Sequence, residues 1–262
     1  MKNARQQMII ELLKQDGLVS TSDLTGRFGV SVETIRRDFK QLEKAGILKP
    51  AYGGAMPLSG TLRITELDAW QDRAASFRQE KSWIARKAAE YVPDGSVLAT
   101  DVGTTMFELA RHLNQKSNLT IITNDLRLAQ EFRQDRHHVF LAGGLLNTSL
   151  YTSGELCREF VDHFALIDLF IFSADGITLE DGLTTIRPEE NELKKRFIQK
   201  AEKKIAVVDH SKFGKKALLH TCRFDQIDLL ITDSRAPDGL VQAIRKFTNV
   251  DMVSPDSDAV AG

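Results

Sequence analysis

The first 46 positions of the chain repeat apolar residues with the period of an α-helix. Apolar side chains three and four residues apart predict a helix over about residues 3–15. A second, shorter helix is predicted between the capping candidates Ser20 and Thr21 and a stop at Gly29. A third helix is predicted to begin at Ser31, whose hydroxyl can accept a hydrogen bond from a backbone N–H two or three residues further on. The head of the chain is therefore predicted to contain three helices.

The third helix has an apolar face beside a basic one. The apolar positions, which we expect in a core, are Val32, Ile35, Phe39 and Leu42. The basic and polar positions, which we expect to face outward, are Arg36, Arg37, Lys40 and Lys44, with Thr34, Asp38 and Gln41 beyond them. Two short helices joined by a glycine turn are typical of a helix-turn-helix that places its second helix in the major groove of DNA. A small helical subdomain with a solvated basic face has the same pattern, so periodicity alone leaves both interpretations open.

The chain after the third helix predicts a small β-wing and then a connector. Ile47 and Leu48 suit a short strand, and Gly53-Gly54 suits a tight turn. The following stretch has no sustained period, and the sequence does not decide which domain Trp70 contacts. The predicted organisation is a helical head domain over 1–56, a linker over 57–78, a second, larger domain over 79–253 and a disordered tail over 254–262.

From residue 79 onward, short apolar runs alternate with helical stretches, which predicts an α/β domain with a mainly parallel sheet. Ligands of such sheets bind beyond the carboxyl ends of the strands. The residues that follow the predicted strands are Gly103, Thr104 and Thr105, then Asn124, Gly143 and Gly144, Asp175, and finally Asp209, Ser211 and Lys212. Each is also a common turn residue when taken singly. Together they supply carboxylates for hydroxyl groups, backbone donors for phosphate and a lysine, which suits a phosphorylated sugar.

Composition and charge narrow the class of protein. The chain has 262 residues, of which 42% are hydrophobic and 27% charged, as in an ordinary soluble protein. Its net charge of −1 divides into +3 for residues 1–55 and −4 for the remainder, which permits nucleic-acid binding by the head. No apolar run is long enough to span a membrane and no signal peptide is present, so we expect a cytoplasmic protein without a membrane partner.

Cysteine and histidine give no support for a disulfide, a metal site or a cofactor. Cys157 and Cys222 are isolated and are interpreted as ordinary buried thiols. The neighbouring His137 and His138 would point to opposite faces of a strand and are therefore unlikely partners for one ion. His210 stands beside Asp209 and is either a pocket residue or a surface histidine, of which we favour the surface position.

The head resembles the DNA-binding domain of the DeoR family of bacterial transcriptional regulators. The stretch "VSVETIRRDFKQLEKAG" and the Gly-Gly-Ala at 53–55 carry this resemblance. The resemblance implies a winged helix-turn-helix domain, and it places the following residues at the DNA: Ser20, Ser31, Thr34, Arg36, Arg37, Lys40, Tyr52, Gly53 and Gly54. The family often has a basic residue and a histidine before Gly-Gly, where this chain has Pro50 and Tyr52, so weaker wing contacts are expected.

The body resembles the DeoR-type sensor domain through "DVGTT", "TN", "AGG", "SADG" and "VVDHSKFG". This implies a mainly parallel α/β fold resembling ribose-5-phosphate isomerase. It also implies an effector pocket lined by Asp101, Gly103, Thr104, Thr105, Asn124, Gly143, Gly144, Asp175, Glu190, Lys194 and Lys212. Glu190 and Lys194 stand four residues apart and can pair with each other, although a plain surface ion pair would have the same spacing. Arg187-Pro188 departs from the family pattern and indicates either a more anionic effector or simply a helix start.

Two functions fit these observations. The first is a transcriptional regulator, a repressor of a carbohydrate catabolic operon that binds double-stranded operator DNA as a dimer or tetramer and is released by a phosphorylated sugar. It needs no catalytic residue. The second is a sugar-phosphate isomerase with an appended helical domain, in which Glu190 or Asp175 would be the base and Lys194 or Lys212 the electrophile. We favour the first, because the basic third helix has no role in isomerisation.

Overall fold

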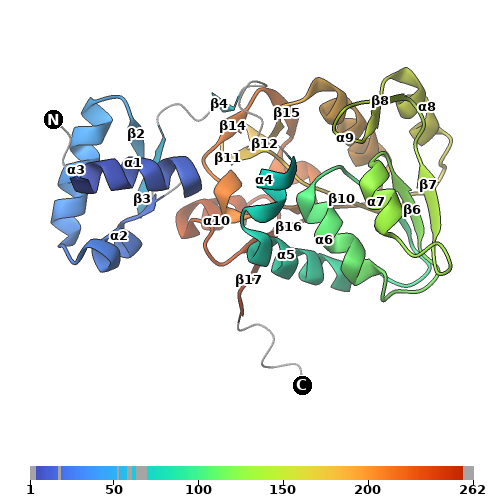
Figure 1. Cartoon of the computed structure of the whole chain (residues 1–262), viewed down its shortest axis with the longest axis horizontal. Helices are drawn as coiled ribbons and strands as arrows, with labels where there is room; N and C mark the ends of the chain where they lie inside the picture. The colour runs from blue at the N-terminus through green and yellow to red at the C-terminus, as the bar shows by residue number, and fades with distance from the viewer. Residues whose placement is uncertain (1–3, 17–18, 52, 58–60, 63–69, 256–262) are drawn as a thin grey trace.

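The computed structural model describes residues 4–16, 19–51, 53–57, 61–62 and 70–255. Its N-terminal part stands at one end of the molecule, beside a larger α/β part (Figure 1). Tyr52, residues 58–60 and 63–69 of the predicted linker, and residues 256–262 of the predicted tail lie outside the described residues.

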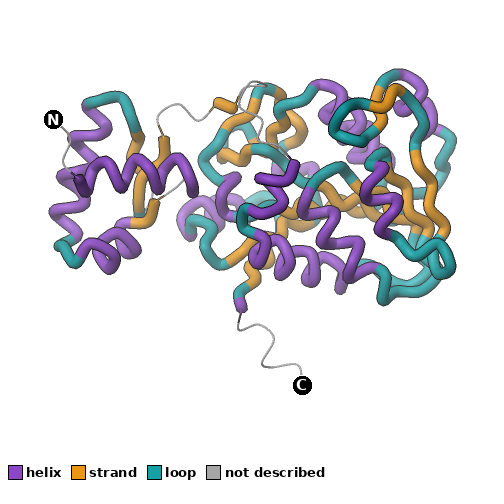
Figure 2. Tube along the Cα trace, viewed as in Figure 1, coloured by secondary structure: helices purple, strands orange, loops and turns teal. Residues whose placement is uncertain are grey.

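The N-terminal part is three helices packed beside a small antiparallel sheet (Figure 2). The helices are α1 (Ala4–Asp16), α2 (Thr21–Phe28) and α3 (Val32–Lys44), and the sheet has the order β1 (Val19–Ser20), β3 (Gly54–Pro57), β2 (Leu48–Ala51). The hydroxyl of Ser31 accepts from the N–H of Thr34 at 3.3 Å, and that of Ser20 accepts from the N–H of Asp23 at 3.4 Å. The caps that begin both helices of the predicted helix-turn-helix are therefore confirmed, and the β2–β3 hairpin forms the predicted wing.

Two predictions for the third helix are wrong. Ile35, Phe39 and Leu42 are buried as expected, but Val32 is 45% exposed, because the first turn of α3 extends past the core. Asp38, expected on the outer face, is only 3% exposed. Its carboxylate accepts from Arg5 Nε at 2.6 Å and from the side-chain amide of Gln6 at 3.0 Å, so it joins α3 to α1.

The larger part is built on a seven-stranded parallel sheet, which confirms the predicted fold class. Its order is β17 (Asn249–Val253), β16 (Leu229–Asp233), β13 (Lys203–Val207), β10 (Leu169–Phe172), β5 (Val97–Thr100), β6 (Thr120–Thr123), β7 (His138–Leu141). One face packs on α5 (Arg78–Glu90), α6 (Thr104–Leu113) and α7 (Leu126–Glu131). The other packs on α8 (Glu155–Asp162), α9 (Pro188–Lys200) and α10 (Asp238–Ile244). Two apolar cores therefore enclose the sheet.

Smaller elements surround this sheet. A second antiparallel sheet has the order β11 (Gly176–Thr178), β12 (Gly182–Thr185), β15 (Leu219–Cys222). The other paired strands are β8 (Leu145–Leu146) with β9 (Thr152–Ser153) and β14 (Lys216–Ala217) with β4 (Thr61–Leu62). The remaining helical elements are α4 (Trp70–Ala75) and the 3-10 turns η2 (His210–Lys212) and η3 (Phe224–Gln226).

The two parts meet where α1 lies next to η2. A cavity of about 150 Å³ lies between them, with Asp23 and Arg27 of α2 on one side and His210 and Arg235 on the other. His210 is only 5% exposed, so its expected surface position is wrong. Its Nδ1 lies 3.0 Å from Asp233, and the ring of Phe77 packs edge-on against it, which accounts for the burial.

The predicted burial of the two cysteines is confirmed, and the neighbouring histidines differ in exposure. Cys157 and Cys222 are both buried and free. His137 is buried while His138 is exposed, as expected for neighbouring positions at the start of a strand. The described residues contain no group of three or more His, Cys, Asp or Glu that could hold a metal ion.

Candidate functional site

The carboxyl ends of β5, β10 and β13 meet at a cavity of about 160 Å³. These strands are neighbours in the sheet, so the chain segments that follow them line the same hollow. A single buried water needs roughly 10–15 Å³ of cavity volume, measured as the space open to the centre of a water molecule. The cavity therefore has room for a small polar molecule. This is the position at which an open α/β sheet is expected to bind a ligand.

Seven of the eleven residues predicted for the effector pocket line this cavity. They are Gly103, Thr104, Thr105, Asp175, Glu190, Lys194 and Lys212. The other four, which do not line it, are Asp101, Asn124, Gly143 and Gly144. Asp101 lies directly behind the cavity, where its carboxylate is 3.1 Å from Lys194 Nζ.

The remaining three residues have structural contacts of their own. The side-chain amide of Asn124 donates to the carbonyl of Thr152 at 2.8 Å and is buried there. At Gly144, which has a φ of +147°, a Cβ atom would lie 2.5 Å from the carbonyl oxygen of Ser153. That close approach explains the glycine without a ligand. Both glycines follow β7, the edge strand, which is two strands away from β5.

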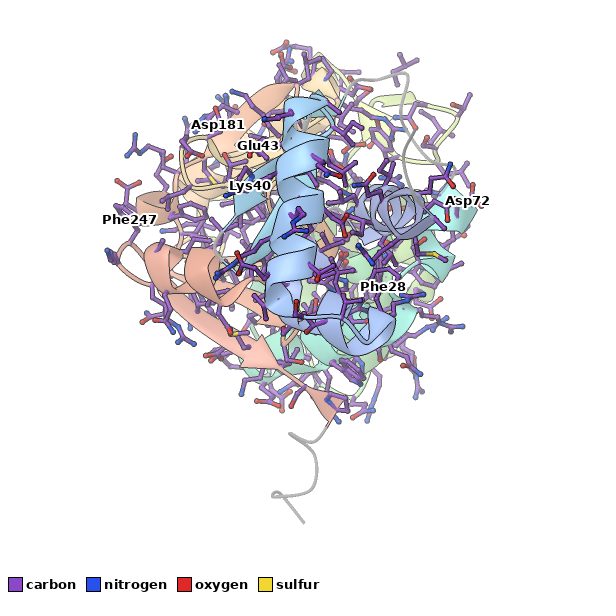
Figure 3. All side chains as sticks on the ribbon, turned by 90° about the vertical axis from the view of Figure 1, so that its left-hand side faces the viewer. Phe28, Lys40, Glu43, Asp72, Asp181 and Phe247 are labelled. Atoms are coloured by element: carbon purple, nitrogen blue, oxygen red, sulfur yellow. The ribbon has the colours of Figure 1, made fainter. Side chains whose placement is uncertain are left out.

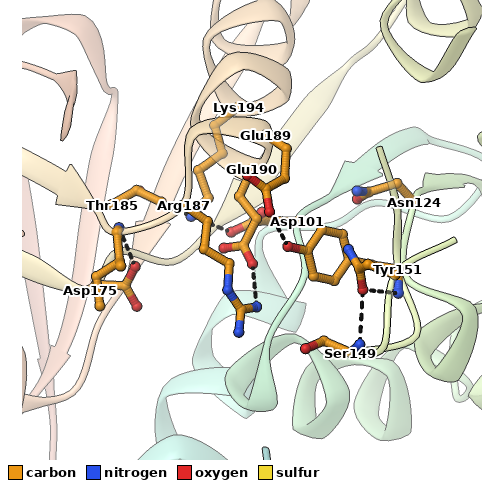
Figure 4. A network of polar contacts seen from close by, with 12 residues as sticks. Asp101, Asn124, Ser149, Tyr151, Asp175, Thr185, Arg187, Glu189, Glu190 and Lys194 are labelled. Atoms are coloured by element: carbon orange, nitrogen blue, oxygen red, sulfur yellow. Dashed lines mark hydrogen bonds and ion pairs between the residues drawn. The ribbon is translucent and has the colours of Figure 1, made fainter. Parts of the chain in front are cut away.

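One end of the cavity is a buried carboxylate–lysine cluster (Figure 4). Lys194 is 3% exposed and contacts Asp101 and the hydroxyl of Thr185, the latter at 3.3 Å. Glu190 pairs instead with Arg187 at 2.9 Å. The expected Glu190–Lys194 ion pair is therefore replaced by two separate pairs, and both residues are buried rather than at the surface. Glu190 pairs with Arg187 at the start of its own helix, whereas Lys194 reaches Asp101, which follows β5.

Charge at this end depends on burial and on neighbouring carboxylates. Burial raises the pKa of Glu190, and the nearby Asp175 and Asp101 raise it further against the effect of Lys194. Burial acts to lower the pKa of Lys194, but Asp101, Glu190 and Asp175 together raise it above its usual value. Lys194 is therefore held as a cation beside Asp101 and Glu190, whose pKa values are both raised by burial. Such a cluster presents both hydrogen-bond donors and acceptors to hydroxyl groups.

The other end of the cavity is cationic. Lys81 of α5 is 4% exposed, and burial lowers its pKa to about 8 although Asp209 acts in the opposite direction. Burial acts to raise the pKa of Asp209, but Lys212, Lys81 and the hydroxyl of Ser211 outweigh it and hold this pKa below its usual value. The N-terminus of α6 opens onto the same region, with Gly103 at a φ of +140° as its cap. Ammonium groups and the N-terminus of a helix thus line the same cavity, a combination that is typical of phosphate sites.

The cavity lining as a whole carries an excess of positive charge. Seven cationic side chains face four carboxylates, a net of three positive charges. The cationic residues that we did not predict from the sequence are Arg73, Lys81, Arg127 and Lys215. The burial of Lys81 could have been predicted from the sequence, because it shares a helix face with Ile84, Ala85 and Ala88. A lysine on an apolar helix face is rarely buried unless it has a partner. Arg73 and Arg127 lie on short helices whose pattern carries no such signal.

The second candidate site is the exposed face of α3 in the N-terminal part. An open groove runs between α3 and the wing, and it is lined by Thr21, Glu33, Arg36, Arg37, Phe39, Lys40, Glu43, Pro50, Gly53 and Gly54. Figure 3 looks directly onto this end of the molecule, where α3 runs lengthwise with Lys40 and Glu43 labelled. Arg36 has a side chain that is 66% exposed and lies 3.8 Å from Glu33, so its guanidinium remains available.

Three of the predicted DNA contacts, Ser20, Ser31 and Thr34, do not line this groove, and Ser20 lines the cavity between the two parts instead. Ser31 and Thr34 share a hydrogen bond of 3.0 Å at the start of α3, where their hydroxyls are at or near the surface. The hydroxyl of Ser20 is 2.6 Å from that of Ser22 at the start of α2. Gly54 lies where a Cβ atom would be 2.0 Å from the carbonyl oxygen of Val19, so the packing of β1 on the wing requires a glycine there.

The fold and the two sites define a class: a winged helix-turn-helix with an exposed basic helix, joined to an α/β domain with a small polar cavity. Comparison with known families agrees with this description. Residues 5–61 match the DeoR-like helix-turn-helix domain, and residues 76–234 match the DeoR C terminal sensor domain. The chain belongs to the DeoR family of DNA-binding transcriptional regulators.

Several named relatives are similar over most of the chain. The glycerol-3-phosphate regulon repressor of Escherichia coli is 36% identical, over 92% of this chain and 94% of its own. The transcriptional regulator GolR of Listeria innocua is 34% identical, over 88% and 90%. The transcriptional repressor AccR of Agrobacterium fabrum is 33% identical, over 88% and 89%. Family membership among regulators does not favour the isomerase alternative.

Among solved structures, a D-ribose-5-phosphate isomerase in complex with phospho-erythronic acid aligns with 52% of this chain and 54% of its own, at 15% identity and a TM-score of 0.40.

Within the described part of the chain, no helix is long and apolar enough to cross a membrane.

Proposed function

We propose that this protein is a repressor that binds operator DNA through α3 and releases it when a phosphorylated sugar or polyol occupies the cavity of the sensor domain. The observation that carries the proposal is the division of the cavity into a cationic end and a carboxylate–lysine end. A phosphorylated polyol has the same division, because its phosphate is a dianion and its other end carries hydroxyl groups. On this proposal the chain acts in the cytoplasm and has no catalytic role.

The proposed ligand fits the two ends in one orientation. Its phosphate lies against Lys81, Lys212 and the N-terminus of α6 from Gly103 to Thr105, where charge and free N–H groups converge. Its hydroxyls lie against Asp175, Glu190 and Lys194. In the reverse orientation the dianion would meet the buried carboxylates of Asp175 and Glu190, whereas at the cationic end Lys81 and Lys212 offset the carboxylate of Asp209.

The turn η2 supports a coupling between ligand and DNA. Ser211 and Lys212 of η2 line the ligand cavity, whereas His210 of the same turn lines the cavity against the N-terminal part. A ligand that draws Lys212 toward its phosphate therefore acts on a three-residue turn that also contacts α1. Because such coupling is reciprocal, bound operator must weaken ligand binding by the same factor by which ligand weakens operator binding.

We further propose that the protein acts as a homo-oligomer whose copies meet through the surface formed by β7, β8 and α8. Large apolar side chains are exposed there: Phe140 is 43% exposed, Leu145 75%, Leu146 51% and Leu156 69%. Figure 1 places these three elements together at the end of the molecule away from the N-terminal part. Since β7 is also an edge strand, the same surface on a second copy can cover it about a two-fold axis. Two recognition helices are then available for two half-sites.

Fluorescence anisotropy with labelled DNA from upstream of the protein's own gene tests the proposal. Salt is held fixed because phosphate contacts make the affinity strongly salt-dependent. Glycerol 3-phosphate, glucose 6-phosphate and fructose 1-phosphate are added in turn, each beside its unphosphorylated parent. Release by a phosphorylated compound and not by its parent is the expected result. Specific binding that no compound weakens would leave the DNA-binding function and remove the proposed effector class.

A pair of variants tests the reading helix in the same assay. The double substitution Arg36→Ala, Arg37→Ala is expected to weaken specific DNA binding by at least tenfold, because each bidentate contact to a base contributes about 1–3 kcal/mol. Ligand affinity should stay unchanged. Arg133→Ala, at an exposed arginine of the sensor domain, is the matched control and should leave both affinities unchanged. Unaltered DNA binding in the double variant would show that α3 does not read the operator.

A further inference from the structure

The helix α4 forms one wall of the ligand cavity. Trp70 and Arg73 of α4, with Ser76 and Phe77 just after it, line the hollow. In the chain, α4 follows the connection from the DNA-binding domain and precedes α5, the first long helix of the sensor domain. The wall is therefore made by the part of the sensor domain that is covalently closest to the DNA-binding head.

Two hydrogen-bond donors of α4 are buried without an acceptor. Arg73 Nε and Trp70 Nε1 have no hydrogen-bond partner among the described residues, although both atoms are inaccessible to solvent. A buried donor without a partner costs about 1–3 kcal/mol, so native proteins rarely keep one without a function. The other side-chain atoms of this kind in the described chain belong to Thr100, His137, Asn147, His210 and Thr232, none of which lines this cavity.

The position of α4 is fixed by contacts that leave these donors unused. The ammonium group of Lys81 donates to the carbonyl of Ser76 at 2.8 Å and to that of Arg73, which holds the end of α4. The ring of Trp70 packs edge-on against Phe107 with centroids 5.6 Å apart, and the guanidinium of Arg127 lies 4.8 Å from the indole ring. The sequence did not decide where Trp70 packs, and the structure places it on the sensor domain. Trp70 and Arg73 thus line the cavity from a well-packed helix.

We propose that Arg73 and Trp70 contact the anionic oxygens of the bound effector, so that α4 is part of the effector site and is held against the sensor domain when the site is filled. This inference rests on the proposed function, because it assigns the acceptor of the two donors to the phosphorylated ligand. Arginine suits this role, since its planar guanidinium stays charged and binds phosphate oxygens in pairs. Through α4, occupancy of the cavity acts directly on the chain segment that leads to the DNA-binding head.

Tryptophan fluorescence gives a direct test, because the chain contains two tryptophans. In a Trp83→Phe variant, Trp70 is the reporter, and it is titrated with inorganic phosphate and with glycerol 3-phosphate while calorimetry measures the dissociation constants. We expect a saturable change in emission with the same dissociation constant as calorimetry gives. In a Trp70→Phe variant, Trp83 should report a smaller change or none.

Substitutions then separate α4 from the rest of the site. Arg73→Gln should raise the dissociation constant for phosphate about tenfold or more and remove most of the Trp70 signal, because a hydrogen bond to a charged group is lost. Arg73→Lys should restore part of the affinity. Arg78→Gln is the matched control, since Arg78 is 64% exposed in its side chain and does not line the cavity. The unfolding midpoint of each variant is measured to confirm that the sensor domain remains folded.

The outcomes distinguish this inference from the proposed function. If Lys212→Gln weakens phosphate binding and Arg73→Gln does not, the phosphate site stands and the role of α4 is overturned. If neither inorganic phosphate nor glycerol 3-phosphate binds the unsubstituted protein, the proposed ligand class fails and the inference fails with it. Weakened binding in Arg73→Gln, with an unchanged Arg78→Gln control, supports both.

Discussion

The depressed pKa of Lys81 predicts that effector affinity falls as pH rises above about 8. Lys81 lies at the cationic end of the cavity, faced by Asp209, Lys212, Arg73 and Glu108. Burial is the largest influence on its pKa, which is lowered from 10.5 to about 8. Below that pH the ammonium is available to the phosphate dianion, and above it the free protein has lost the proton. Phosphate monoesters have their second pKa near 6, so the ligand keeps its charge throughout this range.

The magnitude follows from the titration. At pH 9, about a tenth of the Lys81 side chains in the free protein keep their proton, so the dissociation constant should rise by up to roughly tenfold per pH unit above 8. Tyr151 does not interfere, because burial raises its pKa still further above its usual value. Calorimetry of glycerol 3-phosphate binding from pH 6.5 to 9.5 measures the effect. In Lys81→Arg the profile should be flat, since arginine stays protonated.

The same pKa shift has the opposite effect on the stability of the ligand-free protein. Between pH 8 and 10.5 the unfolded chain keeps the Lys81 proton that the folded chain has released, so the free energy of unfolding rises with pH. The full gain is about 3 kcal/mol, at 1.36 kcal/mol per pKa unit. Lys81→Met should remove this rise in urea unfolding. An affinity for glycerol 3-phosphate that changes less than twofold between pH 7 and 9.5 would refute the assignment of Lys81 to the phosphate end.

Three further predictions concern packing and assembly. Asp38→Ala leaves the donors of Arg5 and Gln6 without their acceptor, so amide exchange in α3 should accelerate about thirtyfold, equivalent to about 2 kcal/mol, whereas Asp38→Asn should have a smaller effect. Gly144→Ala should lower the thermal stability of the sensor domain by about 1–3 kcal/mol through strain while changing ligand affinity less than twofold; Gly143→Ala, where a Cβ meets no atom within 4 Å, is the control. Leu145→Asp with Leu146→Asp should yield monomers in sedimentation velocity. Leu218→Asp is the control and should not, because Leu218 is 50% exposed but lies outside the surface formed by β7, β8 and α8. An unchanged sedimentation coefficient in the double variant would place the oligomer contact on another surface.

Much of the fold could be predicted because its signals are local. The caps at Ser20 and Ser31 and the apolar spacing of α3 depend on neighbours a few residues away, and the structure bears them out. The alternation of apolar runs and helices predicted a parallel sheet for the same reason. Val32 and Asp38 show the limit of this reasoning, because burial depends on which elements pack around a position: the first turn of α3 extends past the core at Val32, whereas α1 covers Asp38.

The sequence by itself determined the two-part architecture, the basic face of α3 and the chemical types that gather after the strands. Only the tertiary structure decided which of those strand ends meet. The order of the sheet makes β5, β10 and β13 neighbours and puts β7 at the edge, so Gly143 and Gly144 lie away from the cavity although they follow a strand as Gly103 does. Lys81 and Arg73 line the cavity for the same physical reason. Strand order and helix packing bring together residues that are far apart in the chain, and local sequence patterns do not show which residues will meet.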